Sequence, residues 1–193
     1  IDEIGIGFML APVFHPAMRA VIGPRRELQM RTIFNILGPL TNPAGADAQL
    51  VGVYDAALVP TLADALARLP VKRALVVNSP GLDEVGLHGP TTAAEVTGDT
   101  VELYEIAPAD FGLEEAPIEA ITGGSPAENA QTLEAVITGI DDGPVREVVL
   151  ANTAAALYVC DSVTSFEAGT ARAAAAIDSG AAGDVLDAMR AGI

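Results

Sequence analysis

Two adjacent acidic residues are the first candidates for chemistry in this 193-residue chain. Asp83 and Glu84 follow the segment Ser79-Pro80-Gly81, whose proline and glycine predict a turn. Carboxylates on such a turn are the hard oxygen ligands that Mg²⁺ prefers when water and phosphate fill its other positions. The alternative is a solvated acidic turn in a very acidic protein, and spacing alone favours that alternative.

Positive charge is scarce, so its concentration near the N-terminus is informative. Arginine and histidine side chains gather in residues 15–31, and a guanidinium can bind a carboxylate through two hydrogen bonds. This stretch could therefore recognise an acidic small molecule, although pairing with acidic surface residues explains it equally well. The residues concerned are His15, Arg19, Arg25, Arg26 and Arg31.

The familiar motifs of nucleotide binding and covalent catalysis do not occur in the sequence. There is no Walker loop, His-Glu-x-x-His, Cys-x-x-Cys or Gly-x-Ser-x-Gly. Gly5-Ile6-Gly7 lacks the third glycine of a dinucleotide fingerprint. His15 and His88 are the only histidines, which argues against a histidine-based metal site.

A strand, a helix and a second strand are predicted to position the acidic pair. Gln49–Tyr54 and Arg73–Val77 are apolar strand patterns, and residues 56–69 place leucines at helical spacing after Asp55, the expected N-cap. This order predicts a βαβ unit with parallel strands. Ligands of parallel sheets bind at the carboxyl ends of the strands, which here means Asn78–Glu84.

The rest of the chain predicts a hairpin followed by helices. Thr92–Val96 and Thr100–Ile106 alternate around Gly98-Asp99, a hairpin signal. The fold class is therefore α/β, with a central sheet, a parallel βαβ unit and flanking helices, in one domain over residues 1–193. The expected helices are Pro126–Ile137, which has a capping box at Ser125 and Glu128, and Val145–Cys160, Ser165–Ser179 and Ala182–Arg190.

Composition excludes several classes of function. Hydrophobic residues make up 50% of the chain, which excludes disorder over most of its length. Ten basic against 26 acidic residues give a net charge of −16, which argues against binding to nucleic acid or anionic membranes. Lys72 is the only lysine. High negative charge with so little lysine suggests a cell of high internal salt, and a GC-rich genome is the alternative.

Cysteine use and hydropathy predict a cytoplasmic location. The single cysteine, Cys160, lies in an apolar run and is expected to be a small buried residue in a reducing compartment. No apolar run approaches the ~20 residues of a membrane span, and no signal-peptide pattern is present. The opening at Ile1 instead of Met suggests that the chain is truncated at its N-terminus.

Several unusual sequence segments point to one enzyme family. The densest part contains Phe-His-Pro-Ala-Met-Arg at residues 14–19 and Asn-Ile-Leu-Gly-Pro-Leu-Thr-Asn-Pro at residues 35–43. Pro-Gly-Leu-Asp-Glu-Val at residues 80–85 and Asn-Thr-Ala-Ala-Ala-Leu at residues 152–157 also match. These segments resemble those of the anthranilate phosphoribosyltransferase family of tryptophan biosynthesis, and the resemblance runs in order from the first residue to the last helices.

The resemblance implies a fold and a reaction. The fold would be the large domain of the nucleoside phosphorylase and phosphoribosyltransferase type. The enzyme would transfer the phosphoribosyl group of phosphoribosyl diphosphate to the amino group of anthranilate, with Mg²⁺ as cofactor and release of diphosphate. No covalent nucleophile is needed, so no catalytic residue is assigned. The full-length enzyme would form a homodimer.

Site residues follow from the same resemblance. His15 and Arg25 match residues on the anthranilate side, with Arg25 facing the carboxylate of anthranilate. Pro39, after Gly38, matches the proline that lines the aromatic pocket. Asp83 and Glu84 match the metal-binding pair, which reverses the interpretation of a merely solvated turn.

The chain departs from the family pattern at its N-terminus. The glycine-rich diphosphate loop, the lysine-bearing motif and the small helical domain that precede His-Pro-Ala-Met are not in these 193 residues. We therefore expect this chain alone to bind phosphoribosyl diphosphate poorly and to turn over little or nothing. A natural subunit that completes its site with a separate N-terminal polypeptide is also possible on sequence grounds. The alternative functions are a pyrimidine-nucleoside phosphorylase-like enzyme and a nucleic-acid-binding relative of the fold.

Overall fold

The computed structural model describes residues 1–9, 11–14, 37–38, 40–42 and 44–192. The chain divides into two compact units, residues 1–46 and residues 47–193. The described part of the first unit includes the short helix α1 (Ala11–Phe14). The expectation that residues 1–193 form one domain stays a prediction, because the two units are described separately.

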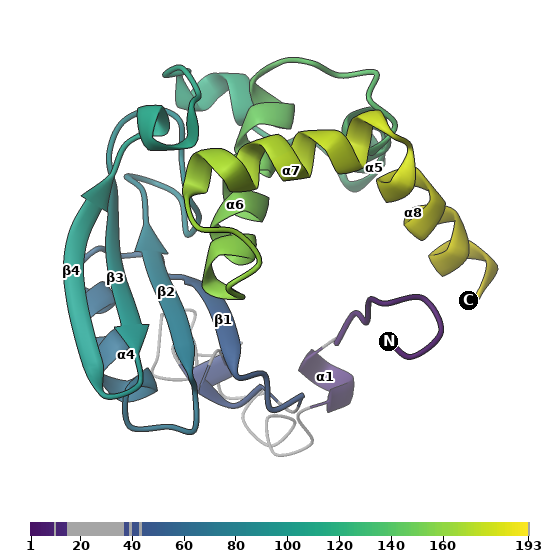
Figure 1. The fold of residues 1–193 in the computed structure, drawn as a ribbon. Helices are drawn as coiled ribbons and strands as arrows, with labels where there is room; N and C mark the ends of the chain where they lie inside the picture. Colours follow the sequence, from purple (N-terminus) through teal and green to yellow (C-terminus); the bar gives the residue numbers. More distant parts are fainter. Residues whose placement is uncertain (10, 15–36, 39, 43, 193) are drawn as a thin grey trace, which may run out of the picture. The chain divides into compact units, whose positions relative to one another are not determined.

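The second unit is built on a four-stranded sheet (Figure 1). The strands lie in the order β1 (Ala48–Gly52), β2 (Arg73–Asn78), β3 (Thr91–Thr97) and β4 (Thr100–Ile106). β1 pairs with β2 in parallel, and the other two pairs are antiparallel. The parallel pair and the hairpin around Gly98 are therefore confirmed, as is the α/β fold class.

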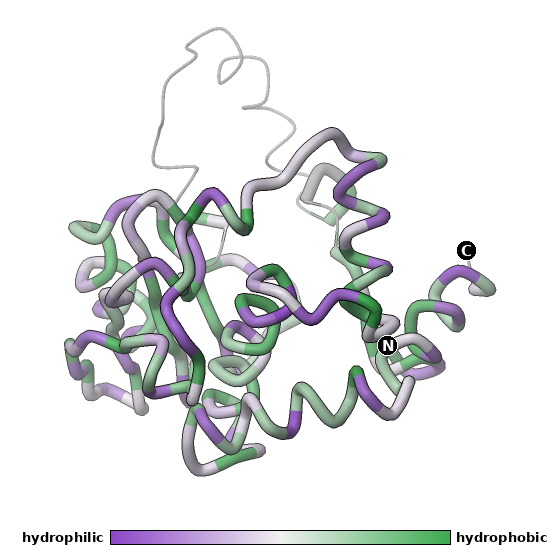
Figure 2. Tube along the Cα trace, turned by 90° about the horizontal axis from the view of Figure 1, so that it is seen from above, coloured by the Kyte–Doolittle hydropathy of each residue, from purple (hydrophilic) through white to green (hydrophobic). Residues whose placement is uncertain are grey.

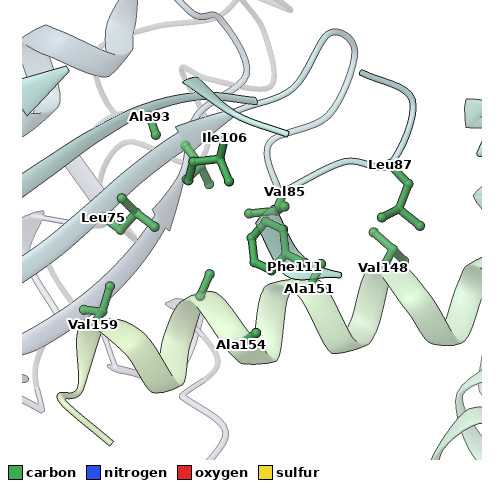
Figure 3. Close-up of a cluster of buried hydrophobic side chains, with 12 residues drawn as sticks. Leu75, Val85, Leu87, Ala93, Ile106, Phe111, Val148, Ala151, Ala154 and Val159 are labelled. Carbon is green, nitrogen blue, oxygen red and sulfur yellow. The ribbon is translucent and has the colours of Figure 1, made fainter. Parts of the chain in front are cut away.

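Helices cover both faces of the sheet. Five of the six residues of β2 are buried, although neighbouring side chains of a strand point to opposite faces. Helix α4 (Leu58–Leu66) contacts β2 and β3, and α6 (Pro144–Val159) contacts β1 and β2. The main core lies on the α6 side, where apolar residues of the sheet meet those of the helix. Figure 3 labels its principal members: Leu75, Val85, Leu87, Ala93, Ile106, Phe111, Val148, Ala151, Ala154 and Val159.

Helix α4 is shorter than the predicted helix over residues 56–69. Its N-cap is Ala57, and Asp55 is not the N-cap that the sequence predicted. The Asp55 carboxylate instead accepts a hydrogen bond from the Ala57 N–H at 3.0 Å, so it stabilises the turn that leads into the helix.

The C-terminal helices follow the predicted order. They are α5 (Pro126–Ile137), α6, α7 (Phe166–Asp178) and α8 (Ala181–Ala191), preceded by the short 3₁₀ helices η2 (Pro108–Phe111) and η3 (Ile118–Ile121). The capping box at Ser125 begins α5 as predicted. Helix α7 approaches α6 closely at Gly169, where a Cβ atom would lie 2.8 Å from the Cα of Ala154.

Cys160 is exposed, so the prediction of a buried cysteine is wrong. Helix α6 ends at Val159, which is buried, and Cys160 is the C-cap residue that follows it. Its N–H still bonds to the Ala156 carbonyl, but its side chain lies beyond the part of the helix that packs against the sheet.

Figure 2 shows apolar and polar residues interspersed along the helices. Within the part of the chain that the structure describes, no helix is long and apolar enough to cross a membrane.

A half-buried ion pair joins β2 to β3 at the end of the sheet away from Asp83. Arg73 donates from Nε at 3.0 Å and from Nη2 at 2.7 Å to Oε1 of Glu95, and both side chains are 17% exposed. The guanidinium lies 4.2 Å from the ring centroid of Tyr158 on α6. The Tyr104 hydroxyl of β4 donates to the other Glu95 oxygen at 3.1 Å. These contacts connect three strands with α6.

Loss of this ion pair should destabilise the fold. Arg73→Met leaves the Glu95 carboxylate without its charge partner in a half-buried position, so we expect a loss of about 3 kcal/mol in the free energy of unfolding. The control is Lys72→Met, which removes a pair with Asp47 between side chains that are 81% and 56% exposed and should leave the free energy of unfolding nearly unchanged. Urea unfolding at constant salt measures both. Equal losses would contradict the structural importance of the Arg73–Glu95 pair.

Candidate metal and substrate site

A tight turn after β2 carries the acidic pair. The Ser79 N–H donates to the Leu82 carbonyl at 3.1 Å, and the Leu82 N–H donates to the Ser79 carbonyl at 2.9 Å. Pro80 and Gly81 are the central residues, and Gly81 has a φ of +83°, as the second central position of a type II turn requires. The chain therefore reverses directly after the strand and presents the next residues, Asp83 and Glu84, at its surface.

The turn folds back over the end of β1, where Gly52 makes room for it. A Cβ atom at position 52 would lie 1.5 Å from the carbonyl oxygen of Asp83, so no side chain fits there. The Asp83 backbone therefore packs directly against the Cα of Gly52. This contact places the acidic pair at the carboxyl ends of the two parallel strands, where the sequence predicted it.

Two buried hydroxyl groups stabilise the loop after the turn through hydrogen bonds. Ser79 and Thr91 are both fully buried, and their hydroxyl oxygens lie 2.7 Å apart. Ser79 Oγ donates to the Glu84 carbonyl at 2.9 Å and accepts from the Gly86 N–H at 2.7 Å. Since the single Ser79 hydroxyl proton goes to Glu84, Thr91 supplies the proton between the two hydroxyls. The backbone on either side of Val85 is thereby fixed to the strands.

Two further side chains satisfy the carbonyls of the loop. The Asn78 amide is buried and donates from Nδ2 to the carbonyls of Val53 at 2.7 Å and Leu82 at 3.1 Å. His88 Nε2 lies 2.7 Å from the Pro80 carbonyl. A carbonyl can only accept, so Nε2 carries the proton. His88 thus stabilises the turn, a role that the sequence did not predict.

Helix α6 holds the residue that follows Glu84. Oδ1 of Asn152 accepts from the Val85 N–H at 3.0 Å, and Nδ2 of Asn152 donates to the Val85 carbonyl at 2.9 Å. Val85 and Leu87 are buried in the core against α6, as Figure 3 shows. Asn152 belongs to the Asn-Thr-Ala-Ala-Ala-Leu segment of the family resemblance, and no sequence pattern predicted its bonds to Val85.

The two carboxylates have the chemistry that a magnesium ion requires. Both residues are exposed to solvent, Glu84 only in part, and neither forms an ion pair with any residue that the structure describes. Partial burial, and then the charge of Asp83, raise the pKa of Glu84 above its ordinary value. No group of three or more His, Cys, Asp or Glu in the described part of the chain could hold a metal. Two carboxylates with water and phosphate as further ligands fit Mg²⁺.

The other predicted site residues belong to the first unit. His15, Arg25 and Pro39 lie outside the described residues. Gly38 is described: it is exposed, and its carbonyl accepts a hydrogen bond from the Thr41 N–H at 3.1 Å. Their proximity to Asp83 and Glu84 stays a prediction, because the two units are described separately.

The sheet and its acidic turn define an α/β domain of the phosphoribosyltransferase type. The sequence model of the glycosyl transferase family, a/b domain, matches residues 1–183, and the chain belongs to this family.

The relatives narrow the assignment. The chain is 60% identical over 190 residues to an anthranilate phosphoribosyltransferase of Haloferax volcanii and 62% identical over 187 residues to that of Haloarcula marismortui. These matches cover 98% and 97% of this chain but 57% and 56% of the relatives, so the chain spans little more than half their length. The organisms are haloarchaea, which supports the expectation of a high-salt cell.

Solved structures agree with the family resemblance. The crystal structure of anthranilate phosphoribosyltransferase from Thermus thermophilus has a TM-score of 0.89 and 42% identity, and the match covers 96% of this chain and 55% of that one. The Saccharomyces cerevisiae enzyme in complex with PRPP and Mg has a TM-score of 0.83 and 32% identity, over 93% and 52% of the two chains. The predicted phosphoribosyltransferase-type fold is confirmed.

Substitution of Gly52 should displace the acidic turn. In Gly52→Ala the new methyl group must push the Asp83 backbone away, so we expect a loss of at least ~3 kcal/mol in the free energy of unfolding. The control is Gly183→Ala in α8, where nothing lies within 4 Å of the added atom and where alanine should stabilise the helix by roughly 0.5–1 kcal/mol. Thermal and urea unfolding measure both. An unchanged stability of Gly52→Ala would show that the turn does not need this contact.

The raised pKa of Glu84 predicts a stability that depends on pH. Because the folded chain binds this proton more tightly than the unfolded chain, ionised Glu84 lowers stability as pH rises above the ordinary glutamate value of 4.5. Without divalent cations, Glu84→Gln should therefore melt higher than the unaltered chain at pH 7, and the difference should shrink below about pH 4. Glu114→Gln, at an exposed carboxylate, corrects for the change in net charge. A lower melting temperature of Glu84→Gln at pH 7 would contradict the prediction.

Proposed function

We propose that the full-length protein transfers the phosphoribosyl group of phosphoribosyl diphosphate to the amino nitrogen of anthranilate and releases diphosphate. The observation that carries this proposal is the exposed Asp83–Glu84 pair at the carboxyl ends of β1 and β2. Relatives of 60% and 62% identity bear the name anthranilate phosphoribosyltransferase. Structures of the same fold contain 4-fluoroanthranilate in one case and PRPP with Mg in another.

Asp83 and Glu84 would hold Mg²⁺ together with the diphosphate of the substrate. A magnesium ion there supplies positive charge against the negative charge that develops on the leaving diphosphate. The chain contributes by holding both carboxylates at the carboxyl ends of β1 and β2, where a ligand can reach them. Besides partial burial, the neighbouring charge of Asp83 raises the pKa of Glu84, and a divalent cation would relieve this repulsion.

Residues 15–39 would bind the acceptor, as the family resemblance implies. In this proposal the Arg25 guanidinium binds the carboxylate of anthranilate, and His15 lies on the same side. Pro39, after Gly38, lines the pocket for the aromatic ring. These residues orient the amino nitrogen toward C1′ of the ribosyl group, and the reaction needs orientation and charge stabilisation instead of a protein nucleophile.

In the proposed reaction one bond at C1′ of the ribosyl group breaks and another forms. The bond from C1′ to the diphosphate oxygen breaks, and that oxygen keeps the electron pair. The nitrogen of anthranilate forms the new bond to C1′ and then loses a proton to solvent. A pyrimidine-nucleoside phosphorylase would act at the same carbon, but the names of the relatives and structures do not favour it. Homodimer formation and a cytoplasmic location are parts of the proposal.

Loss of anthranilate fluorescence tests the proposed reaction. The assay uses a form of the protein extended by the upstream ~140–150 residues that the family resemblance implies, in high-salt buffer. We expect turnover only when anthranilate, phosphoribosyl diphosphate and Mg²⁺ are all present. The double variant Asp83→Asn, Glu84→Gln should lower kcat/KM by at least roughly 100-fold, because both proposed metal ligands lose their charge.

A second variant tests the acceptor side separately. Arg25→Ala should raise the KM for anthranilate about tenfold or more and leave the KM for phosphoribosyl diphosphate unchanged, since one charge-assisted contact is lost. Arg68→Ala, at an exposed residue of the second unit, is the matched control. A folded extended protein without turnover would refute the proposed function, and equal effects of Arg25→Ala and Arg68→Ala would refute the role of Arg25.

A further inference from the structure

The carboxamide of Asn152 replaces a strand as the partner of the Val85 backbone. Val85 directly follows Glu84, is only 1% exposed and lies outside the strands and helices. A buried backbone needs partners for both its N–H and its carbonyl. Asn152 supplies both, as acceptor at 3.0 Å and as donor at 2.9 Å. The two residues are 67 positions apart in the sequence, so this contact fixes the loop to a distant helix.

Asn152 is itself held in one orientation. The second proton of its Nδ2 goes to the Val148 carbonyl at 2.9 Å, one turn earlier in α6. On the same helix Val148, Ala151 and Ala154 are packed in the core against the sheet. The carboxamide therefore cannot rotate without losing hydrogen bonds, and it transmits the rigid position of α6 to the loop.

The acidic pair is thus fixed on both sides. The Asp83 backbone lies against Gly52 of β1, and the residue after Glu84 is bonded to α6. The two carboxylates have no ion pair with any described residue that could fix them instead. Their spacing therefore depends on the backbone that carries them.

We propose that Asn152 is a positioning residue for the metal site: by bonding both backbone groups of Val85 it holds Asp83 and Glu84 in the arrangement that binds Mg²⁺ with the substrate diphosphate. The inference rests on the proposed function, because that function requires a metal at this pair. Asn152 touches neither carboxylate, so it acts only through the loop.

Three substitutions separate the positioning role of Asn152 from an effect on the stability of α6. Asn152→Ala removes both contacts with Val85 but favours the helix, since alanine has a higher helix propensity than asparagine. Weakening of α6 therefore cannot explain its effects. Asn152→Asp keeps an acceptor for the Val85 N–H but loses the donor to the Val85 carbonyl. Thr153→Ala changes the exposed neighbour in the same helix and is the matched control.

Two measurements on the extended protein test the inference. Hydrogen–deuterium exchange reports on the loop without any metal, and we expect Asn152→Ala to accelerate exchange in residues 83–86 about tenfold, as for the loss of one buried hydrogen bond. Exchange in α4 and β3 should not change. Electron paramagnetic resonance of Mn²⁺, in the presence of phosphoribosyl diphosphate, should show an affinity weakened by roughly tenfold. Asn152→Asp should show both changes, and Thr153→Ala neither.

The double variant Asp83→Asn, Glu84→Gln distinguishes a failure of the inference about Asn152 from a failure of the proposed function. It should lose Mn²⁺ binding without any acceleration of amide exchange in residues 83–86. The inference is overturned if Asn152→Ala leaves exchange in residues 83–86 unchanged, accelerates exchange equally in α4 and β3, or loosens the loop without weakening Mn²⁺ binding. If the unaltered protein binds no more Mn²⁺ than the doubly substituted one, the proposed function fails, and the metal role of Asn152 fails with it even where the exchange result holds.

Discussion

The contact between the Asp83 carbonyl and the Cα of Gly52 is the constraint on which the candidate site depends. With any side chain at position 52, the turn after β2 could not fold back over the end of β1. The hydrogen bonds of Asn78 and Ser79 reach the loop only because the loop lies there. The location of the two carboxylates thus follows from a missing side chain in the neighbouring strand, and polar contacts then stabilise the arrangement.

Ionisation of Glu84 opposes folding, and the structure around this residue compensates. Partial burial and the adjacent Asp83 carboxylate raise the pKa of Glu84, which means that the ionised form is disfavoured in the folded chain. Val85 and Leu87, directly beyond the pair, are almost fully buried against α6 and bind the loop to the core. Two adjacent carboxylates thus lie where a ligand is expected, and the burial of Val85 and Leu87 compensates for the stability lost there.

The parts of the fold that local sequence determines were predictable. The parallel pair, the hairpin at Gly98 and the start of α5 at Ser125 each depend on residues close together in the chain. The site was predictable only in part. The glycine in β1 could have indicated a close backbone approach, but the bond between Asn152 and Val85 joins residues too far apart for any spacing rule. The exposure of Cys160 depends on where α6 ends and how it packs against the sheet, which the apolar run around Cys160 did not indicate. His15, Arg25 and Pro39 rest on the family resemblance.

We propose that Asp83 and Glu84, held by Gly52 and α6, form the metal end of a phosphoribosyl transfer site. A crystal structure of the extended protein with Mn²⁺ and phosphoribosyl diphosphate tests it most directly, because anomalous scattering locates the ion. We expect an anomalous peak at about 2.0–2.3 Å from carboxylate oxygens of both residues, with diphosphate oxygens completing the coordination. An ion bound elsewhere, with both carboxylates directed into solvent, would contradict it.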